Sequence, residues 1–169
     1  MAVWPPEEVL DLIGGLARPD VDGLRWTTRD QWHVTLRFFG NVELEEALGA
    51  LRQVSAEATV AELGPETGRF GKRILHVPVG GLEPVGKAVV RATKKVGRPP
   101  ENRPFSAHLT LARARDRRRG VDLRSLCGGP VAASWPVREI CLVQSHLSSK
   151  GANYEVVENV SLGDARTIG

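Results

Sequence analysis

A four-residue pattern occurs twice in this chain of 169 residues, as HVTL at 33–36 and as HLTL at 108–111. Roughly 0.02 such His-x-Thr-Leu strings are expected by chance in a sequence of this composition, so two copies indicate a duplicated element. Each copy lies in a run of alternating apolar and polar residues, at about 32–39 and 105–113, which is typical of a half-buried strand. The repeat therefore predicts a fold with two similar halves, each contributing one such strand.

Alternation along each strand predicts which side chains share a face. The His and the Thr of each copy lie on the same face, and Arg37 joins them in the first copy. The opposite, apolar faces carry Trp32, Val34, Leu36 and Phe38 in the first copy, and Ala107, Leu109 and Leu111 in the second. A His and a Thr two residues apart are separated by about 6.6 Å along a strand, so both can contact one small anion.

The composition is that of a globular domain, with 41% hydrophobic and 25% charged residues. We expect residues 1–169 to form a single domain of two lobes. No apolar run is long enough to span a membrane and no signal-peptide pattern opens the chain, so we expect a cytoplasmic protein. Cys127 and Cys141 lack CxxC spacing, and the sequence supports neither a disulfide framework nor a zinc site.

The remaining hydrophobic pattern predicts an α+β protein with antiparallel sheets and helices packed outside them. Amphipathic helices are predicted at about 5–15, 44–58 and 83–96, with a short helix at 122–126. Besides the two motif strands, strands are predicted at 2–4, 24–28, 73–79, 137–145 and 154–157. Nucleotide-binding glycine loops and the HExxH metalloprotease motif are absent from the sequence.

Arginines gather after the second motif. Between Arg98 and Arg124 the sequence has eight arginines, and five of these fall within 113–119. Such a run is either a solvated loop or a nucleic-acid footprint, and both interpretations stay open at this point.

The paired motifs suit a displacement at phosphorus without a metal ion, because one neutral imidazole can accept a proton while a second, protonated imidazole donates one. The motifs and the segments 4–9 (WPPEEV), 37–40 (RFFG), 105–113 (FSAHLTLAR) and 151–154 (GANY) resemble the two-histidine (2H) phosphoesterases. Among these, the match is to the bacterial and archaeal RNA 2′,3′-cyclic phosphodiesterases first described as 2′-5′ RNA ligases. The resemblance implies a bilobal α+β fold, with two antiparallel sheets and outer helices related by a pseudo-twofold axis, and an active cleft between the lobes.

The resemblance also implies an activity and the residues responsible for it. The implied reaction is hydrolysis of an RNA 2′,3′-cyclic phosphate to a 2′-phosphomonoester without metal or cofactor, with weak 2′-5′ ligation in reverse. Carried over by position, His33 is the proton donor and His108 the proton acceptor, and Thr35 and Thr110 hold the phosphate. Arg113 is implied to contact the substrate, although strict alternation places it off the His face and a solvated arginine is the alternative.

The implied partner is an RNA end, with no membrane and no protein partner, and we expect a monomer. Two other functions fit the sequence: a non-catalytic module that binds RNA ends, and a 2H hydrolase of small cyclic nucleotides. His76 and His146 lie outside the motifs and are expected to be ordinary core or surface residues. The candidates for stacking on a base are Phe38, Phe39, Phe70 and Trp135.

Overall fold

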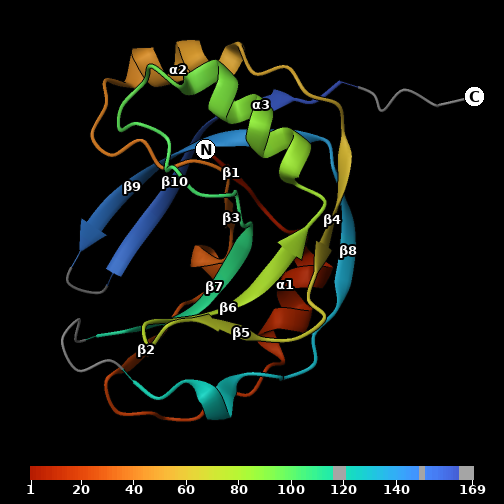
Figure 1. The fold of residues 1–169 in the computed structure, drawn as a ribbon, viewed down its shortest axis with the longest axis vertical. Coiled ribbons are helices and arrows are strands. Elements are labelled where there is room, and N and C mark those ends of the chain that lie inside the picture. The colour runs from red at the N-terminus through yellow and green to blue at the C-terminus, as the bar shows by residue number, and fades with distance from the viewer. Residues whose placement is uncertain (116–120, 149–150, 164–169) are drawn as a thin grey trace, which may run out of the picture.

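The computed structural model describes residues 1–115, 121–148 and 151–163, and Figure 1 shows the fold of this part of the chain. The helices are α1 (Glu7–Gly14), α2 (Leu44–Arg52) and α3 (Glu83–Thr93), and two 3-10 turns span Arg29–Gln31 and Arg124–Leu126. The strands are β1 (Ala2–Val3), β2 (Leu24–Trp26), β3 (Val34–Thr35), β4 (Thr59–Leu63), β5 (Gly68–Phe70), β6 (Ile74–Gly80), β7 (His108–Ala114), β8 (Ala133–Val137), β9 (Glu139–Ser148) and β10 (Gly151–Ser161).

Antiparallel pairing joins the strands into one curled, ten-stranded sheet, and the α+β class predicted from the sequence is confirmed. The path across it runs β10-β9-β1-β3-β7-β6-β4-β8, with β2 beside β7 and β5 beside β6. The two sheets expected from the sequence correspond to the two halves of this path. They meet where β3 pairs with β7, so the two strands that carry the motifs are neighbours at the centre.

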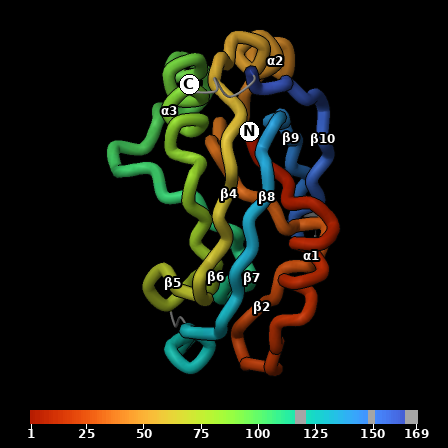
Figure 2. The backbone as a smooth tube through the Cα atoms, turned by 90° about the vertical axis from the view of Figure 1, so that its right-hand side faces the viewer, coloured from red at the N-terminus to blue at the C-terminus, as the bar shows by residue number. Residues whose placement is uncertain are grey.

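The helices pack apolar stripes against the sheet, which the spacing of their buried residues explains. Ile13 of α1, Leu51 of α2 and Val85 of α3 are fully buried. In both views α2 and α3 lie side by side across one end of the molecule, while α1 lies away from them (Figures 1 and 2). The three predicted helices are confirmed: α2 and α3 begin where predicted and α1 begins two residues later, but α2 and α3 end earlier than expected.

Tertiary contacts explain the early ends of two helices. After α2, the N–H of Ala58 donates to the Gly163 carbonyl at 2.7 Å, and Glu57 forms a bridge with Gly163, so this segment pairs as a strand. After α3, the carbonyl oxygens of Thr93 and Val96 accept hydrogen bonds at 3.1 Å from the guanidinium of Arg37, which is distant in the sequence. Pairing with a distant segment outweighs local helix propensity here.

The first motif strand is much shorter than the predicted 32–39, because only Val34–Thr35 is extended and paired. The alternation beyond Thr35 is wrong: Arg37 is buried and Phe38 is 65% exposed. The guanidinium of Arg37 donates to the carbonyls of Thr93, Val96 and Arg98 at 2.8–3.1 Å. These carbonyls lie at and just after the C-terminal end of α3, where a helix carries partial negative charge and favours a cation. The positive charge of Arg37 is therefore stabilised although its side chain is buried.

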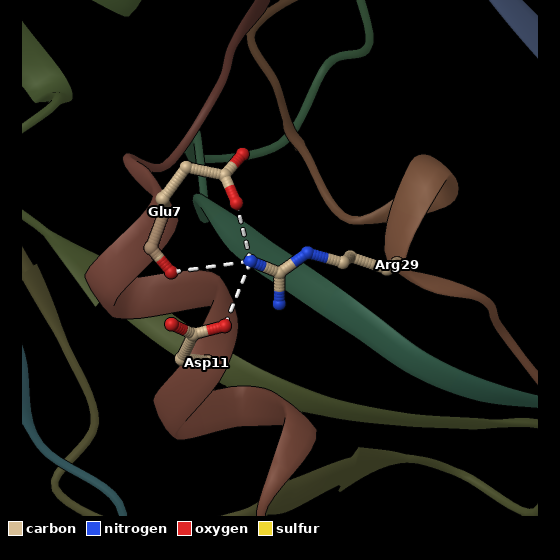
Figure 3. A network of polar contacts seen from close by, with 3 residues as sticks. All are labelled: Glu7, Asp11 and Arg29. Carbon is tan, nitrogen blue, oxygen red and sulfur yellow. Dashed lines mark hydrogen bonds and ion pairs between the residues drawn. The ribbon is translucent and has the colours of Figure 1, made fainter.

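The segment before the first motif is tied to α1. Figure 3 shows Arg29, from the first 3-10 turn, reaching Glu7 and Asp11 on one face of α1, with Nη2 2.8 Å from the Asp11 carboxylate. These ion pairs are exposed and contribute little to stability. They link α1 to the segment that leads to His33, four residues further on.

The centre of the basic run, Arg117, Arg118 and Arg119, lies outside the described residues. The β9–β10 hairpin is longer than predicted, and its connection at 149–150 is also outside. Within the described ranges, no helix is both long and apolar enough to cross a membrane.

Candidate active site

The register between β3 and β7 brings the two motifs together. Val34 pairs with Leu109, and both side chains are fully buried on the core side of the sheet. One residue to each side, the antiparallel register sets His33 opposite Thr110, and Thr35 opposite His108. Residues directly across an antiparallel pair have Cβ atoms about 4.5–5.5 Å apart. The motifs therefore form a square of two imidazoles and two hydroxyls on one face, with each His diagonal to the other.

His33 lies between aromatic side chains. Its ring stacks on Trp4 with centroids 5.0 Å apart, and it meets Tyr154 of β10 edge to face at 4.5 Å. In the described part of the chain its Nδ1 is buried without a hydrogen bond of ordinary geometry. Burial lowers the pKa of His33 to about 4, the Gln31 carbonyl opposes this shift, and the positive charges of the amino terminus, Arg113 and His108 add to it.

His108 differs from His33 in its hydrogen bonding. Its Nδ1 lies 2.9 Å from the Ser106 carbonyl oxygen, so in the neutral ring Nδ1–H donates and Nε2 keeps a lone pair. Burial lowers the pKa of His108, the bond to Ser106 opposes the shift, and the charges of Arg113 and Arg103 lower it further. The neutral ring with a free Nε2 is the form that accepts a proton.

Arg113 lies on the His face, and the strict alternation that placed it on the other face is wrong. Between β6 and β7 the register shifts, so that Leu111 and Ala112 of β7 are consecutive and both buried. This bulge reverses the alternation after Leu111. Arg113 is exposed, its Nη2 is 3.4 Å from Oγ1 of Thr110, and its charge acts on both His33 and His108.

Thr27 holds the bulge in place. Its N–H donates to the Leu111 carbonyl at 2.9 Å, and its hydroxyl lies 2.9 and 2.8 Å from the carbonyls of Thr110 and Leu111. The same hydroxyl accepts a 3.0 Å hydrogen bond from Nε1 of Trp32, the residue before His33. One half-buried hydroxyl therefore connects the first motif to the irregular part of the second.

A third imidazole, His76 of β6, lies beside the square. It is opposite Thr110 in the sheet, 7% exposed, and its ring centroid is 5.5 Å from that of His108. Phe70 stacks on it at 3.9 Å. Burial lowers its pKa to about 4 and the charge of His108 adds to this. His76 is a core residue as expected, but the sequence missed its place at the site, because alternation along one strand does not reveal its partner strand.

The other sequence candidates lie elsewhere or make ordinary contacts. His146 is exposed on the β9–β10 hairpin with Nε2 3.3 Å from a Glu155 carboxylate oxygen, as expected of a surface histidine. Gln31 joins this hairpin to the first motif by donating to the Ala152 carbonyl at 2.7 Å. Among the residues that the structure describes, no three His, Cys, Asp or Glu side chains form a group able to hold a metal ion.

An α+β fold whose two central strands each present a His-x-Thr pair to one face defines a two-histidine phosphoesterase. Comparison with known proteins agrees: residues 3–64 match the family model described as LigT like Phosphoesterase. An RNA 2′,3′-cyclic phosphodiesterase from Aeropyrum pernix is 31% identical over 152 residues, covering 82% of this chain and 86% of that protein. The chain belongs to the LigT-like phosphoesterase family, as the sequence motifs predicted, and is an enzyme of that type.

Solved structures show the same fold. TT0787 of Thermus thermophilus is 27% identical, with a TM-score of 0.76 and 96% of each chain covered. E. coli LigT in its apo form is 21% identical, with a TM-score of 0.73 over 96% of this chain and 95% of that one. E. coli LigT complexed with 3′-AMP superposes with a TM-score of 0.72 at 23% identity, covering 95% of each chain.

Proposed function

We propose that this protein hydrolyses RNA 2′,3′-cyclic phosphate ends to 2′-phosphomonoesters, using His33 and His108 as an acid and base pair without a metal ion. The observation that carries the proposal is the pairing of Val34 with Leu109, which sets two imidazoles and two hydroxyls on one face. The name of the Aeropyrum pernix relative supports the choice of substrate.

The two histidines take opposite parts in the reaction. Nε2 of His108 accepts a proton from a water molecule as the water oxygen bonds to phosphorus. The bond from phosphorus to the ribose 3′ oxygen breaks, and protonated His33 donates its proton to that oxygen. The product is a 2′-phosphate and a free 3′-hydroxyl, and proton exchange with solvent restores both imidazoles. The bond from Nδ1 of His108 to Ser106 favours the assignment of His108 as base, because it leaves Nε2 free to accept.

Thr35, Thr110 and Arg113 stabilise the charge that develops on the non-bridging phosphate oxygens. Hydroxyl and guanidinium donors aimed at such oxygens are effective because they are already in place before the reaction. The 3.4 Å contact between Arg113 and Thr110 supports this role, since it keeps the guanidinium beside one of the hydroxyls.

The lowered pKa of His33, about 4, requires that substrate binding supply the proton-donating form. The cyclic phosphate is an anion, and an anion beside an imidazole favours its protonated state. An acid with a low pKa also gives up its proton readily once the 3′ oxygen begins to leave. The same site with a 5′-hydroxyl of RNA in place of water would form a 2′-5′ linkage, which we propose as a minor activity.

The test is to incubate purified protein with a 2′,3′-cyclic mononucleotide in EDTA between pH 5 and 8 and to identify the product by ³¹P NMR. We expect a 2′-monophosphate and no 3′-monophosphate. Absence of any product would leave the binding module as the better hypothesis. Rapid hydrolysis of the mononucleotide with none of a cyclic-phosphate oligonucleotide would instead favour a small cyclic nucleotide hydrolase.

A further inference from the structure

Phe38 is a large aromatic side chain that the fold leaves uncovered. It is 65% exposed, although sequence alternation placed it in the core. A single exposed apolar residue is common on protein surfaces. Phe38 is distinguished by its neighbour, because the guanidinium carbon of Arg98 lies 5.8 Å from the centroid of its ring. We call Phe38 and Arg98 the Phe38 platform.

The platform is held by the main chain on both sides. The N–H of Arg98 donates to the Phe39 carbonyl at 2.7 Å, and buried Arg37 donates to the Arg98 carbonyl at 2.8 Å. Between these contacts the chain passes close to Phe39 at Gly97, where φ is +62° and a Cβ atom would lie 2.5 Å from the Phe39 carbonyl oxygen. With the main chain fixed in this way, only the two side chains have to be ordered when a ligand binds.

The platform is close to the proposed reaction site. Phe38 is three residues after Thr35, so their Cα atoms are at most about 11 Å apart, a span of one or two nucleotides. The loop that begins with Arg98 also contains Arg103, which pairs with Glu101 and whose charge acts on His108. The loop therefore runs from the platform to the second motif.

We propose that the Phe38 platform binds the nucleotide that precedes the cyclic phosphate in a single-stranded RNA, with its base stacked on Phe38 and its phosphate near Arg98. This inference rests on the proposed function, since it extends the same site by one nucleotide. An aromatic face accepts any base, and an arginine beside it adds attraction for both the base and the phosphate. A stable protein interface buries about 800 Å² on each partner, and one exposed ring beside one arginine does not by itself offer that area.

The experiment compares two substrates, a 2′,3′-cyclic mononucleotide and a trinucleotide ending in the same cyclic phosphate. Phe38→Ala is expected to lower kcat/KM for the trinucleotide by roughly 5-fold or more and to leave the mononucleotide within about 2-fold of wild type. Phe38→Trp should retain the preference and Phe38→Leu should lose it, because stacking needs a ring. Val60→Ala, which truncates a 50% exposed residue on β4, is the matched control.

Arg98→Ala should lower kcat/KM for the trinucleotide and flatten its dependence on salt. Equal effects of Phe38→Ala on both substrates, or no effect on either, would overturn the platform while leaving the proposed function intact. If wild-type protein cleaves neither substrate, the proposed function itself fails. Melting temperatures of the variants should stay near wild type, and the ratio of the two kcat/KM values is insensitive to loss of folded protein.

Discussion

The two copies of the motif have nearly the same sequence but different structural surroundings. The first is extended for only two residues before the chain turns and buries Arg37 at the end of α3. The second continues as a seven-residue strand with a bulge that brings Arg113 beside the histidines. The arginine that follows the motif is structural in one half and faces the site in the other. A repeated pattern thus predicts the candidate site residues, while their neighbours decide what each copy contributes.

The histidines differ in the same way. His108 is oriented by a hydrogen bond to the main chain, whereas His33 is held by stacking on Trp4 and contact with Tyr154. A hydrogen bond at Nδ1 sets the tautomer of a neutral imidazole. The Gln31 carbonyl acts on His33 in the same sense, but without a hydrogen bond of ordinary geometry. The better-formed bond at His108 favours that residue as the base in the proposed reaction.

Removing either imidazole is expected to have the largest effect. His33→Ala and His108→Ala should each lower kcat on the order of 10²-fold or more, because each supplies one proton transfer. Steady-state kinetics with a cyclic mononucleotide measures this, and His146→Ala, at an exposed histidine paired with Glu155, is the matched control. Full activity in either motif variant would contradict the two-histidine assignment.

The next largest effect is expected on the stability of the fold, which should depend on Arg37 and not on Arg113. Arg37→Met removes a buried cation from three carbonyls and should destabilise the fold by on the order of 3 kcal/mol. Arg113→Ala, at an exposed position, should change the free energy of unfolding by less than about 0.5 kcal/mol. Urea denaturation followed by circular dichroism measures both, and equal stabilities would show that the arginines do not differ as described.

Activity, in contrast to stability, should depend directly on Arg113. Arg113→Ala should lower kcat/KM about 10-fold or more, because a donor to the phosphate is lost. Its charge also lowers the pKa of both histidines, so its removal should move the pH optimum upward. Arg115→Ala, at the next exposed arginine, should do neither. An unchanged optimum in Arg113→Ala would mean that this guanidinium does not act on the imidazoles.

A smaller effect is expected at Thr27, which holds the bulge. Thr27→Val removes the hydroxyl and should lower kcat/KM several-fold by shifting Arg113, whereas Thr27→Ser should restore it. In a double-mutant cycle with Arg113→Ala the two losses should not add, because both act through one guanidinium. Additive losses would show that Thr27 acts on the site by another route.

The last and smallest expected effect is a displacement of the pH optimum of wild-type protein below the ordinary imidazole pKa of 6.5. The proposed reaction needs His33 protonated and His108 neutral, so kcat/KM should be bell-shaped between their two free-enzyme pKa values. Both values are lowered by burial, that of His33 to about 4, and the optimum should therefore lie below pH 6.5. The kcat profile should lie at higher pH, because bound phosphate raises the pKa of both imidazoles. An optimum of kcat/KM above pH 7 would contradict these shifts.

Sequence patterns predicted the α+β class, the three helices and two similar His-x-Thr strands, but not that these two strands pair with each other. They did so because periodicity and a rare repeated string are local signals. The extent of the first motif strand, the bulge at Leu111 and the place of His76 depend on which strands become neighbours. No local pattern carries that information. Arg37 shows the limit most clearly, since its burial depends on carbonyls more than 50 residues away.

The most direct test of the acid and base pair is a crystal structure with a nucleoside 2′-monophosphate. We predict that Nε2 of His33 and Nε2 of His108 each lie within about 3.2 Å of oxygens on one phosphoryl group, with Thr35 and Thr110 also bonded to it. A phosphate held by only one of the two histidines, or bound away from both, would contradict the account.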